Sequence, residues 1–241
     1  MAEKSRMLAT DFNAYWRAMY PEAAPLGHLL RTTYPRRWLR LYSLPEGQRY
    51  PADAADWHEL LRRHGTAFAD LVGEPAELFL VTGEYDFADH SRPGPWLFTA
   101  DGALLGLAFT ALPPVALHTL PPDPHVPDEY RPGDVYRPVC RRLDWTAATG
   151  KGSLRAIAEE TLSAFFVSVE FGCILAPYAG GLDLIFPGEA ARNYFATCTR
   201  TGCRPEPMAC SGPRLSFTLT VVAVAEVGHW FQNEVGEQGD P

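Results

Sequence analysis

Four side chains in two separate stretches could together act on an anion: Arg40 and Arg49 in one stretch, Tyr178 and Asp183 in the other. Two guanidinium groups can hold a phosphate or a carboxylate through paired, charge-assisted hydrogen bonds. A carboxylate beside such a group can accept a proton as a general base. One hypothesis is therefore an enzyme that acts on a phosphate- or carboxylate-bearing substrate, with Asp183 as its base.

The stretch around Asp183 has the pattern of a β-hairpin. Two apolar runs flank the turn-rich segment Pro177-Tyr-Ala-Gly-Gly181. We expect Gly180 and Gly181 to take the positive φ that tight hairpin turns prefer. Asp183 then lies on a strand just after the turn, which makes it a leading candidate for recognition.

The arginines of the first third of the chain lie among aromatic residues, Tyr42 and Tyr50 among them. Such a segment can bind a phosphate or an acidic partner. Solvated guanidinium groups whose stems pack on aromatic rings explain the same composition. Both interpretations remain open at this point.

No complete catalytic or metal-binding motif accompanies these residues. Gly150-Lys151 lacks the first glycine and the following Ser or Thr of a phosphate-binding loop, and no Gly-x-Ser-x-Gly elbow occurs. The acidic segment 84–90 and the cysteines Cys198, Cys203 and Cys210 do not have the spacing of a known metal site. We therefore predict no metal and no cofactor.

Composition limits the class of protein. The chain has 241 residues, 46% of them hydrophobic and 21% charged, which is typical of a globular protein. Its net charge of −8 argues against nucleic acid or an anionic membrane as the main partner. The most apolar stretches are too short, or too often broken by proline, to span a bilayer. Five cysteines without a disulfide pattern suit the reducing cytoplasm, so we expect a cytoplasmic protein.

Hydrophobic periodicity predicts the elements. Helices are expected near residues 11–20, 53–72, 153–170 and 188–198. Strands are expected at residues 37–42, 78–82, 96–109 (as a hairpin), 135–145, 174–186 (the hairpin above) and 215–227. His64 falls on the apolar face of the second helix and is expected to be a core histidine. Residues 148–153 are expected to form a flexible turn before the third helix.

These elements predict a single α+β domain over residues 1–241, with a mixed or mostly antiparallel central sheet flanked by about four helices. Prolines are dense in residues 112–138, which favours an irregular surface loop. Residues 199–241 are expected to form a divergent tail.

Two stretches resemble a family of uncharacterised bacterial proteins. Residues 37–50, Arg-Trp-Leu-Arg-Leu-Tyr-Ser-Leu-Pro-Glu-Gly-Gln-Arg-Tyr, fit its opening Arg-Trp-x-Arg-x-x-Ser-Leu-Pro-x-x-x-Arg-Tyr. Residues 177–183 fit its hairpin Pro-Tyr-Asp-Gly-Gly-x-Asp, except that Ala179 replaces an acid, which weakens any two-carboxylate mechanism. The resemblance implies no established activity. It does imply that the strand and turn of residues 38–51 meet the hairpin in space.

We therefore group the candidate binding residues around that meeting point: Trp38, Arg40, Arg49, Tyr50, Tyr178, Gly180, Gly181 and Asp183. The leading functional hypothesis is a non-catalytic cytoplasmic protein that binds another protein, such as a toxin-immunity or accessory protein. Proline-rich loops suited to contact support it, and it predicts an exposed apolar patch. The alternative is the enzyme, which requires Arg40, Arg49, Tyr178 and Asp183 to converge in one pocket.

Overall fold

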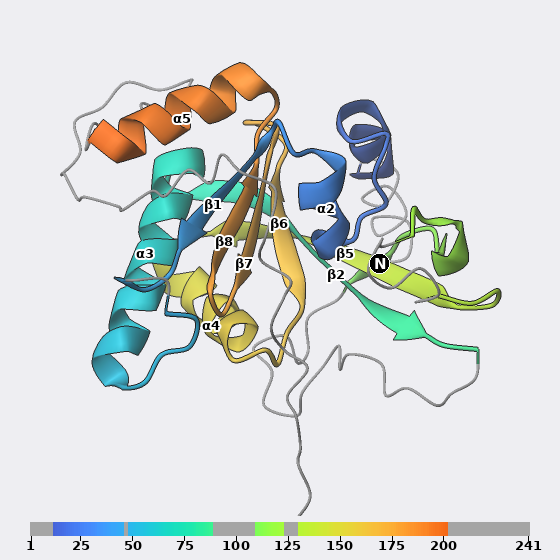
Figure 1. The fold of residues 1–241 in the computed structure, drawn as a ribbon, viewed down its shortest axis with the longest axis horizontal. Helices are drawn as coiled ribbons and strands as arrows, with labels where there is room; N and C mark the ends of the chain where they lie inside the picture. Colours follow the sequence, from blue (N-terminus) through green and yellow to red (C-terminus); the bar gives the residue numbers. More distant parts are fainter. Residues whose placement is uncertain (1–11, 46–47, 89–108, 123–129, 202–241) are drawn as a thin grey trace, which may run out of the picture.

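The computed structural model describes residues 12–45, 48–88, 109–122 and 130–201 (Figure 1). Its helices cover residues 12–19, α2 (Gly27–Thr33), α3 (Ala54–Val72), α4 (Ala147–Ala158) and α5 (Glu189–Thr201), with a short 3₁₀ helix η2 (Leu117–Thr119). Its strands are β1 (Trp38–Tyr42), β2 (Ala76–Asp86), β3 (Thr110–Ala111), β4 (Val115–Ala116), β5 (Val135–Trp145), β6 (Ala164–Ser168), β7 (Cys173–Tyr178) and β8 (Gly181–Ile185). Among the described residues, no helix combines the length and the apolar character needed to cross a membrane.

The strands form one eight-stranded sheet in the order β1-β8-β7-β6-β2-β5-β3, and β4 also pairs with β5. Every pairing is antiparallel, which confirms the predicted α+β class. At one edge, β1 pairs with β8, so an early segment lies beside the late hairpin. The spatial meeting implied by the family resemblance is therefore present.

Helices cover both faces of the sheet (Figure 1). Leu39 and Leu41 of β1 join a core cluster that includes buried residues of α3, α4 and α5. Ile174 and Ile185 face the other way, into a cluster with the helix of residues 12–19 and with α2. Strand side chains alternate between the two faces, so each strand contributes to both layers.

The helix predicted near residues 153–170 is wrong in both of its boundaries. Helix α4 begins earlier, because the Thr146 side chain accepts a hydrogen bond from the Thr149 backbone N–H, and it ends at Ala158. Residues 148–153 are therefore helical rather than a flexible turn. Residues 164–168 form β6, whose Phe165, Phe166 and Val167 are buried against the cores on both faces. A continuous apolar run of this kind fits a buried strand and a buried helix equally well.

The other predicted elements agree with the structure where it describes them. Asp53 caps α3 by accepting from the backbone N–H groups of Ala55 and Asp56. The helix near residues 12–19, β1, β5, the β7–β8 hairpin and α5 also match. Strand β2 is longer than predicted. The strand predicted at residues 215–227 and nearly all of the hairpin at 96–109 lie outside the described residues.

Trp145 determines how closely α4 approaches the sheet. Its buried ring stacks on Phe68 of α3 at 4.3 Å between centroids and meets Phe166 edge-on at 5.4 Å. A Cβ at Gly150 of α4 would overlap the Trp145 ring. Glycine at position 150 therefore allows α4 to pack directly on the indole, even though glycine weakens a helix interior.

We expect Gly150→Ala to lower the free energy of unfolding by about 1–3 kcal/mol, the usual cost of overpacking a core. The control is Gly65→Ala in α3, where nothing lies within 4 Å of the added Cβ. The free energy of unfolding of that variant should instead rise by about 0.5–1 kcal/mol, because alanine has a higher helix propensity than glycine. Urea unfolding of both variants checks the difference, and a stabilised Gly150→Ala protein would contradict the proposed close packing.

Candidate functional site

Arg40 and Asp183 face each other across the β1–β8 pair. Arg40 donates from Nε and Nη2 to the two carboxylate oxygens of Asp183, at 2.7 and 2.9 Å. Its guanidinium also lies 5.3 Å from the Trp38 ring centroid and 5.0 Å from that of Tyr178. Burial alone would lower the pKa of Arg40, but the hydrogen bonds and charge of Asp183 raise it, so the group is a permanent cation.

The two hairpin glycines act through their size rather than through their backbone conformation. The hairpin forms as predicted, but neither Gly180 nor Gly181 takes a positive φ. A Cβ at Gly181 would lie 2.5 Å from the Leu41 carbonyl oxygen and 2.7 Å from Tyr178 Oη. A Cβ at Gly180 would lie 3.0 Å from the Tyr178 ring and 3.2 Å from Arg49 Cγ. The absence of side chains thus lets Tyr178, Arg49 and β1 approach the turn closely.

A pocket of about 610 Å³ opens on the sheet face that α2 covers. Its charged lining residues are Arg31, Arg40, Arg49, Glu160 and Asp183, and its aromatic ones are Tyr42, Tyr136, Phe165 and Tyr178. The remaining lining residues are Gly27, His28, Ile157, Leu162, Ser163, Ala164, Ala176, Pro177 and Gly180. Its volume falls within the range that is usual for small-molecule sites, roughly 300–1,000 Å³.

The structure brings five of the eight candidate binding residues to this pocket, namely Arg40, Arg49, Tyr178, Gly180 and Asp183. The other three, Trp38, Tyr50 and Gly181, support the lining instead. The Trp38 ring lies beneath Arg40, and the Tyr50 ring centroid lies 5.1 Å from the Arg49 guanidinium. Gly181 packs against the Tyr178 hydroxyl. The four residues of the enzyme hypothesis therefore share one pocket.

Several lining residues have no distinctive local pattern in the sequence. Arg31 and His28 come from α2, whose seven residues are too few to establish a helical period. Tyr136 comes from β5, whose alternation predicts a strand but not a site, and Phe165 comes from β6, whose apolar run has no period. The turn after α4 supplies Glu160. Only the packing of these four segments, which lie far apart in the sequence, identifies the residues.

The lining offers more hydrogen-bond donors than acceptors. Both Asp183 oxygens are taken by Arg40, and Glu160 accepts from the Tyr50 hydroxyl at 3.1 Å and lies 3.8 Å from Arg49. Within the described chain, Arg31 has no carboxylate partner, and the hydroxyls of Tyr136 and Tyr178 have no hydrogen-bond partner. Burial raises the pKa of both tyrosines, so their hydroxyls remain donors at neutral pH.

Metal and thiol chemistry find no support in the described residues. No three His, Cys, Asp or Glu side chains there gather to hold a metal ion. Cys203, Cys210 and the end of the 84–90 segment lie outside the described residues. Burial raises the pKa of the thiols of Cys140 and Cys173 to about 12, so both remain protonated and unreactive at neutral pH.

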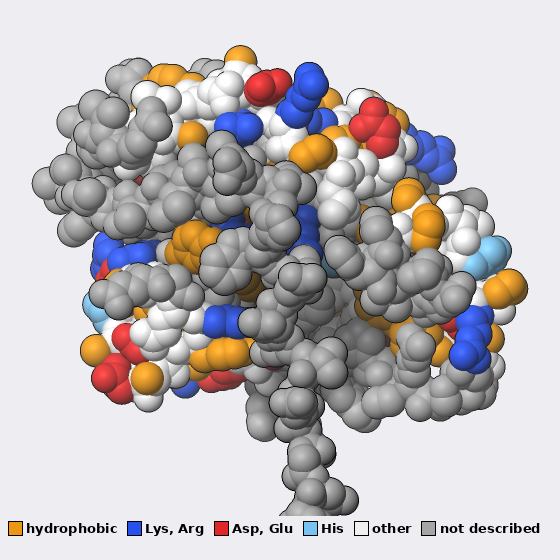
Figure 2. Space-filling model, viewed as in Figure 1, with side chains coloured by type: hydrophobic (Ala, Val, Ile, Leu, Met, Phe, Trp, Pro, Cys, Tyr) orange, Lys and Arg blue, Asp and Glu red, His pale blue; other side chains and the backbone are white. Residues whose placement is uncertain are grey.

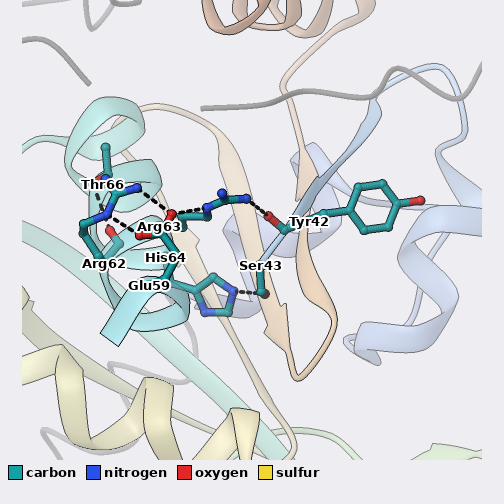
Figure 3. Close-up of polar contacts among 7 residues, drawn as sticks. All are labelled: Tyr42, Ser43, Glu59, Arg62, Arg63, His64 and Thr66. Carbon is teal, nitrogen blue, oxygen red and sulfur yellow. Dashed lines mark hydrogen bonds and ion pairs between the residues drawn. The ribbon is translucent and has the colours of Figure 1, made fainter. Parts of the chain in front are cut away.

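A buried Ser–His pair joins α3 to the end of β1 (Figure 3). Ser43 Oγ lies 2.8 Å from His64 Nε2, and both residues are at most 2% exposed. No substrate reaches this pair, so His64 is the core histidine that the sequence predicts. Arg63 of α3 also donates to the Tyr42 carbonyl at 3.4 Å, and Figure 3 shows the Tyr42 ring pointing away from α3. These contacts fix the backbone that carries Tyr42 at the pocket.

Comparison with known proteins gives one match. A family model described as a domain of unknown function (DUF3885) matches residues 26–197, which is more than half of the chain and includes every lining residue of the pocket. No curated protein matches the chain. No solved structure matches it either.

The Arg40–Asp183 pair should contribute measurably to stability because both side chains are largely shielded from solvent. A double-mutant cycle with Arg40→Gln and Asp183→Asn is expected to give a coupling energy of roughly 1–3 kcal/mol. The same cycle on the exposed pair Arg137–Asp86, also joined at 2.8 Å, should give less than about 0.5 kcal/mol. Equal coupling energies in the two cycles would refute a special role for the pocket pair.

His64 should make stability depend on pH. Burial lowers its pKa from 6.5 to about 4 in the folded state, so below pH 6.5 the unfolded chain binds more protons than the folded one. The contribution of neutral His64 to stability is therefore fully present above pH 6.5, and it is lost as the pH falls toward 4. The shift predicts a loss of about 2 kcal/mol between pH 7.5 and pH 5.

Urea unfolding at several pH values tests this effect. His64→Gln should flatten the profile between pH 7.5 and pH 5, whatever its effect on overall stability. His58→Gln on the same helix, where the side chain is exposed, should leave the profile unchanged. Glu59, whose pKa the bonds from Arg62 and Arg63 lower to about 2, affects only pH values below 4.5. If His64→Gln left the pH dependence of stability unchanged, His64 would not be its source.

Proposed function

The chain belongs to the family of the domain of unknown function DUF3885, and we propose that it is a non-catalytic binding protein for a small anion. The ligand is a molecule with a phosphate or carboxylate group, held in the pocket between α2 and the sheet. The observation that carries this proposal is the surplus of hydrogen-bond donors in the lining.

The surplus follows from the charged groups of the lining. Three arginines line it against two carboxylates, and both carboxylates are already engaged. Among the described residues, Arg40 Nη1 has no partner, because the bonds to Asp183 use Nε and Nη2. In the same part of the chain, Arg31 and the hydroxyls of Tyr136 and Tyr178 add further donors. In a chain with a net charge of −8, such a cluster provides a local positive site that attracts an anion.

The contacts of Asp183 favour binding over catalysis. A general base needs an oxygen that can reach a substrate proton. Both oxygens of Asp183 instead accept hydrogen bonds from Arg40, and this bidentate pair holds the guanidinium in one orientation. Asp183 is thus suited to position Arg40, and Arg40 is the residue of the pair that contacts the anion.

The protein-interaction hypothesis, including a toxin-immunity or accessory role, stays a prediction. Tyr50, Val169 and Tyr194 are the large hydrophobic residues that are exposed in the described chain, and they come from three separate segments. On the face drawn in Figure 2, hydrophobic side chains are interspersed with charged ones. The proposal keeps the cytoplasm as the location, since the described cysteines Cys140 and Cys173 are free thiols.

Titration with inorganic phosphate and with acetate, followed by ¹⁵N NMR, tests the proposal. The amide signals of Gly180 and Gly27, which line the pocket, should shift with at least one of the two anions. Arg31→Gln should weaken that binding about tenfold or more, since a charge-assisted hydrogen bond contributes roughly 1.5–3 kcal/mol. Added sodium chloride should weaken it further by screening.

The matched control is Arg17→Gln, which removes an exposed arginine that does not line the pocket. It should bind the anion as the wild type does. Unchanged amide signals with both anions would refute the proposal, as would equal losses in the two variants. A partner protein captured equally well by wild type and by Arg31→Gln would favour the protein-interaction hypothesis instead.

A further inference from the structure

One end of the pocket carries its charges. Arg40 on β1 and Asp183 on β8 lie in register at the sheet edge, and Ala176 follows on β7. Arg49 packs on Gly180 at the hairpin turn. The Arg40 guanidinium lies 5.0 Å from the Tyr178 ring centroid, and Arg31 lines the same pocket. The anion-binding donors are therefore concentrated around the β1–β8 edge.

The other end of the pocket is aromatic. Phe165 lies on β6 and Tyr136 on β5, further across the same sheet. Helix α2 begins directly over Phe165, because a Cβ at Gly27 would lie 3.6 Å from its ring. The Tyr136 ring packs on Gly83 of β2, where a Cβ would overlap it. Two aromatic rings therefore line this end of the pocket.

A small side chain lies between the two ends. Ala176 of β7 lines the pocket on the same sheet face as Phe165 and does not fill it. From β1 to β6 the sheet advances by three strand spacings, which is about 14 Å. That distance is too long for a bare phosphate to bridge, and it matches a molecule that has an anionic group and a ring.

The Tyr136 hydroxyl adds a polar contact at the aromatic end. Tyr136 is only 6% exposed, and within the described chain its hydroxyl has no hydrogen-bond partner. Because this hydroxyl keeps some exposure, it can donate a hydrogen bond to a ligand atom in the pocket. His28 of α2 lines the same pocket.

We infer that the ligand is an aromatic phosphate or carboxylate that lies along the sheet. Its anionic group lies beside Arg31, Arg40 and Arg49, and its ring packs against Phe165 and Tyr136. This inference rests on the proposed function, because it uses the same pocket and names the ligand class more closely.

Two probes that share an anionic group separate the inference from the function on which it rests. Methyl phosphate and phenyl phosphate are titrated into the full chain and followed by calorimetry or ¹⁵N NMR. Phenyl phosphate is expected to bind at least tenfold more tightly. Equal affinities would overturn the aromatic inference while leaving the anion site intact. No binding of either probe would overturn both.

Ala176→Leu tests the placement of the ring. The larger side chain fills the space between the two ends, so the preference for phenyl phosphate should fall to within about twofold while methyl phosphate still binds. The control is Ala55→Leu at an exposed position of α3, which should keep the full preference. If Ala176→Leu does not fold, Tyr136→Leu serves the same purpose, because it removes the aromatic wall and keeps an apolar side chain. A preference that survives in the folded variant would overturn the placement.

Discussion

The antiparallel pairing of β1 with β8 is the constraint on which both the core and the pocket depend. Leu39 and Leu41 are buried on one face beside Leu184 and Leu182, their partners in register. Because side chains alternate along a strand, this register forces Arg40 and its neighbour Asp183 to the opposite face. A shift by one residue would bury the ion pair in the core and expose the leucines. Hydrophobic burial thus fixes the position of the anion-binding arginine.

A second interaction holds the helical layer over that face. The Arg37 guanidinium lies 4.8 Å from the ring centroids of both Tyr20 and Tyr34. It also donates to the carbonyls of Phe186, at 2.6 Å, and Met19, at 3.3 Å. One cation therefore links the helix of residues 12–19, the segment after α2 and the end of β8. This link holds α2 where Arg31 can reach the pocket.

The opposite face contributes mainly stability, and from its core cluster Ile157 and Leu162 also reach the pocket. Helix α3 meets the end of β1 through the buried contact of Ser43 with His64, and the Ser43 N–H donates to the Gly180 carbonyl at 3.2 Å. The exit from β1 is thus tied to the hairpin turn on which Arg49 packs. Rigid elements on one face of the sheet position a polar site on the other, an arrangement that favours a preorganised binding pocket.

Local patterns determined much of this protein. The alternation in residues 37–42, the N-cap and helical period of residues 53–72 and the glycine-rich turn predicted β1, α3 and the β7–β8 hairpin. Strand β1 and the hairpin line the pocket, and they carry the predicted Arg40, Tyr178 and Asp183. The boundary between α4 and β6 could not be read in the same way, because the apolar run at residues 164–168 has no period of its own and its strand state comes from pairing with β2 and β7. Arg31 and Tyr136 became lining residues only through packing, since α2 is short and β5 lies four strands from β8. Sequence therefore specified the chemistry at the charged end of the pocket, whereas only the tertiary structure joined it to an aromatic end, because contacts between distant segments are set by burial on a shared sheet.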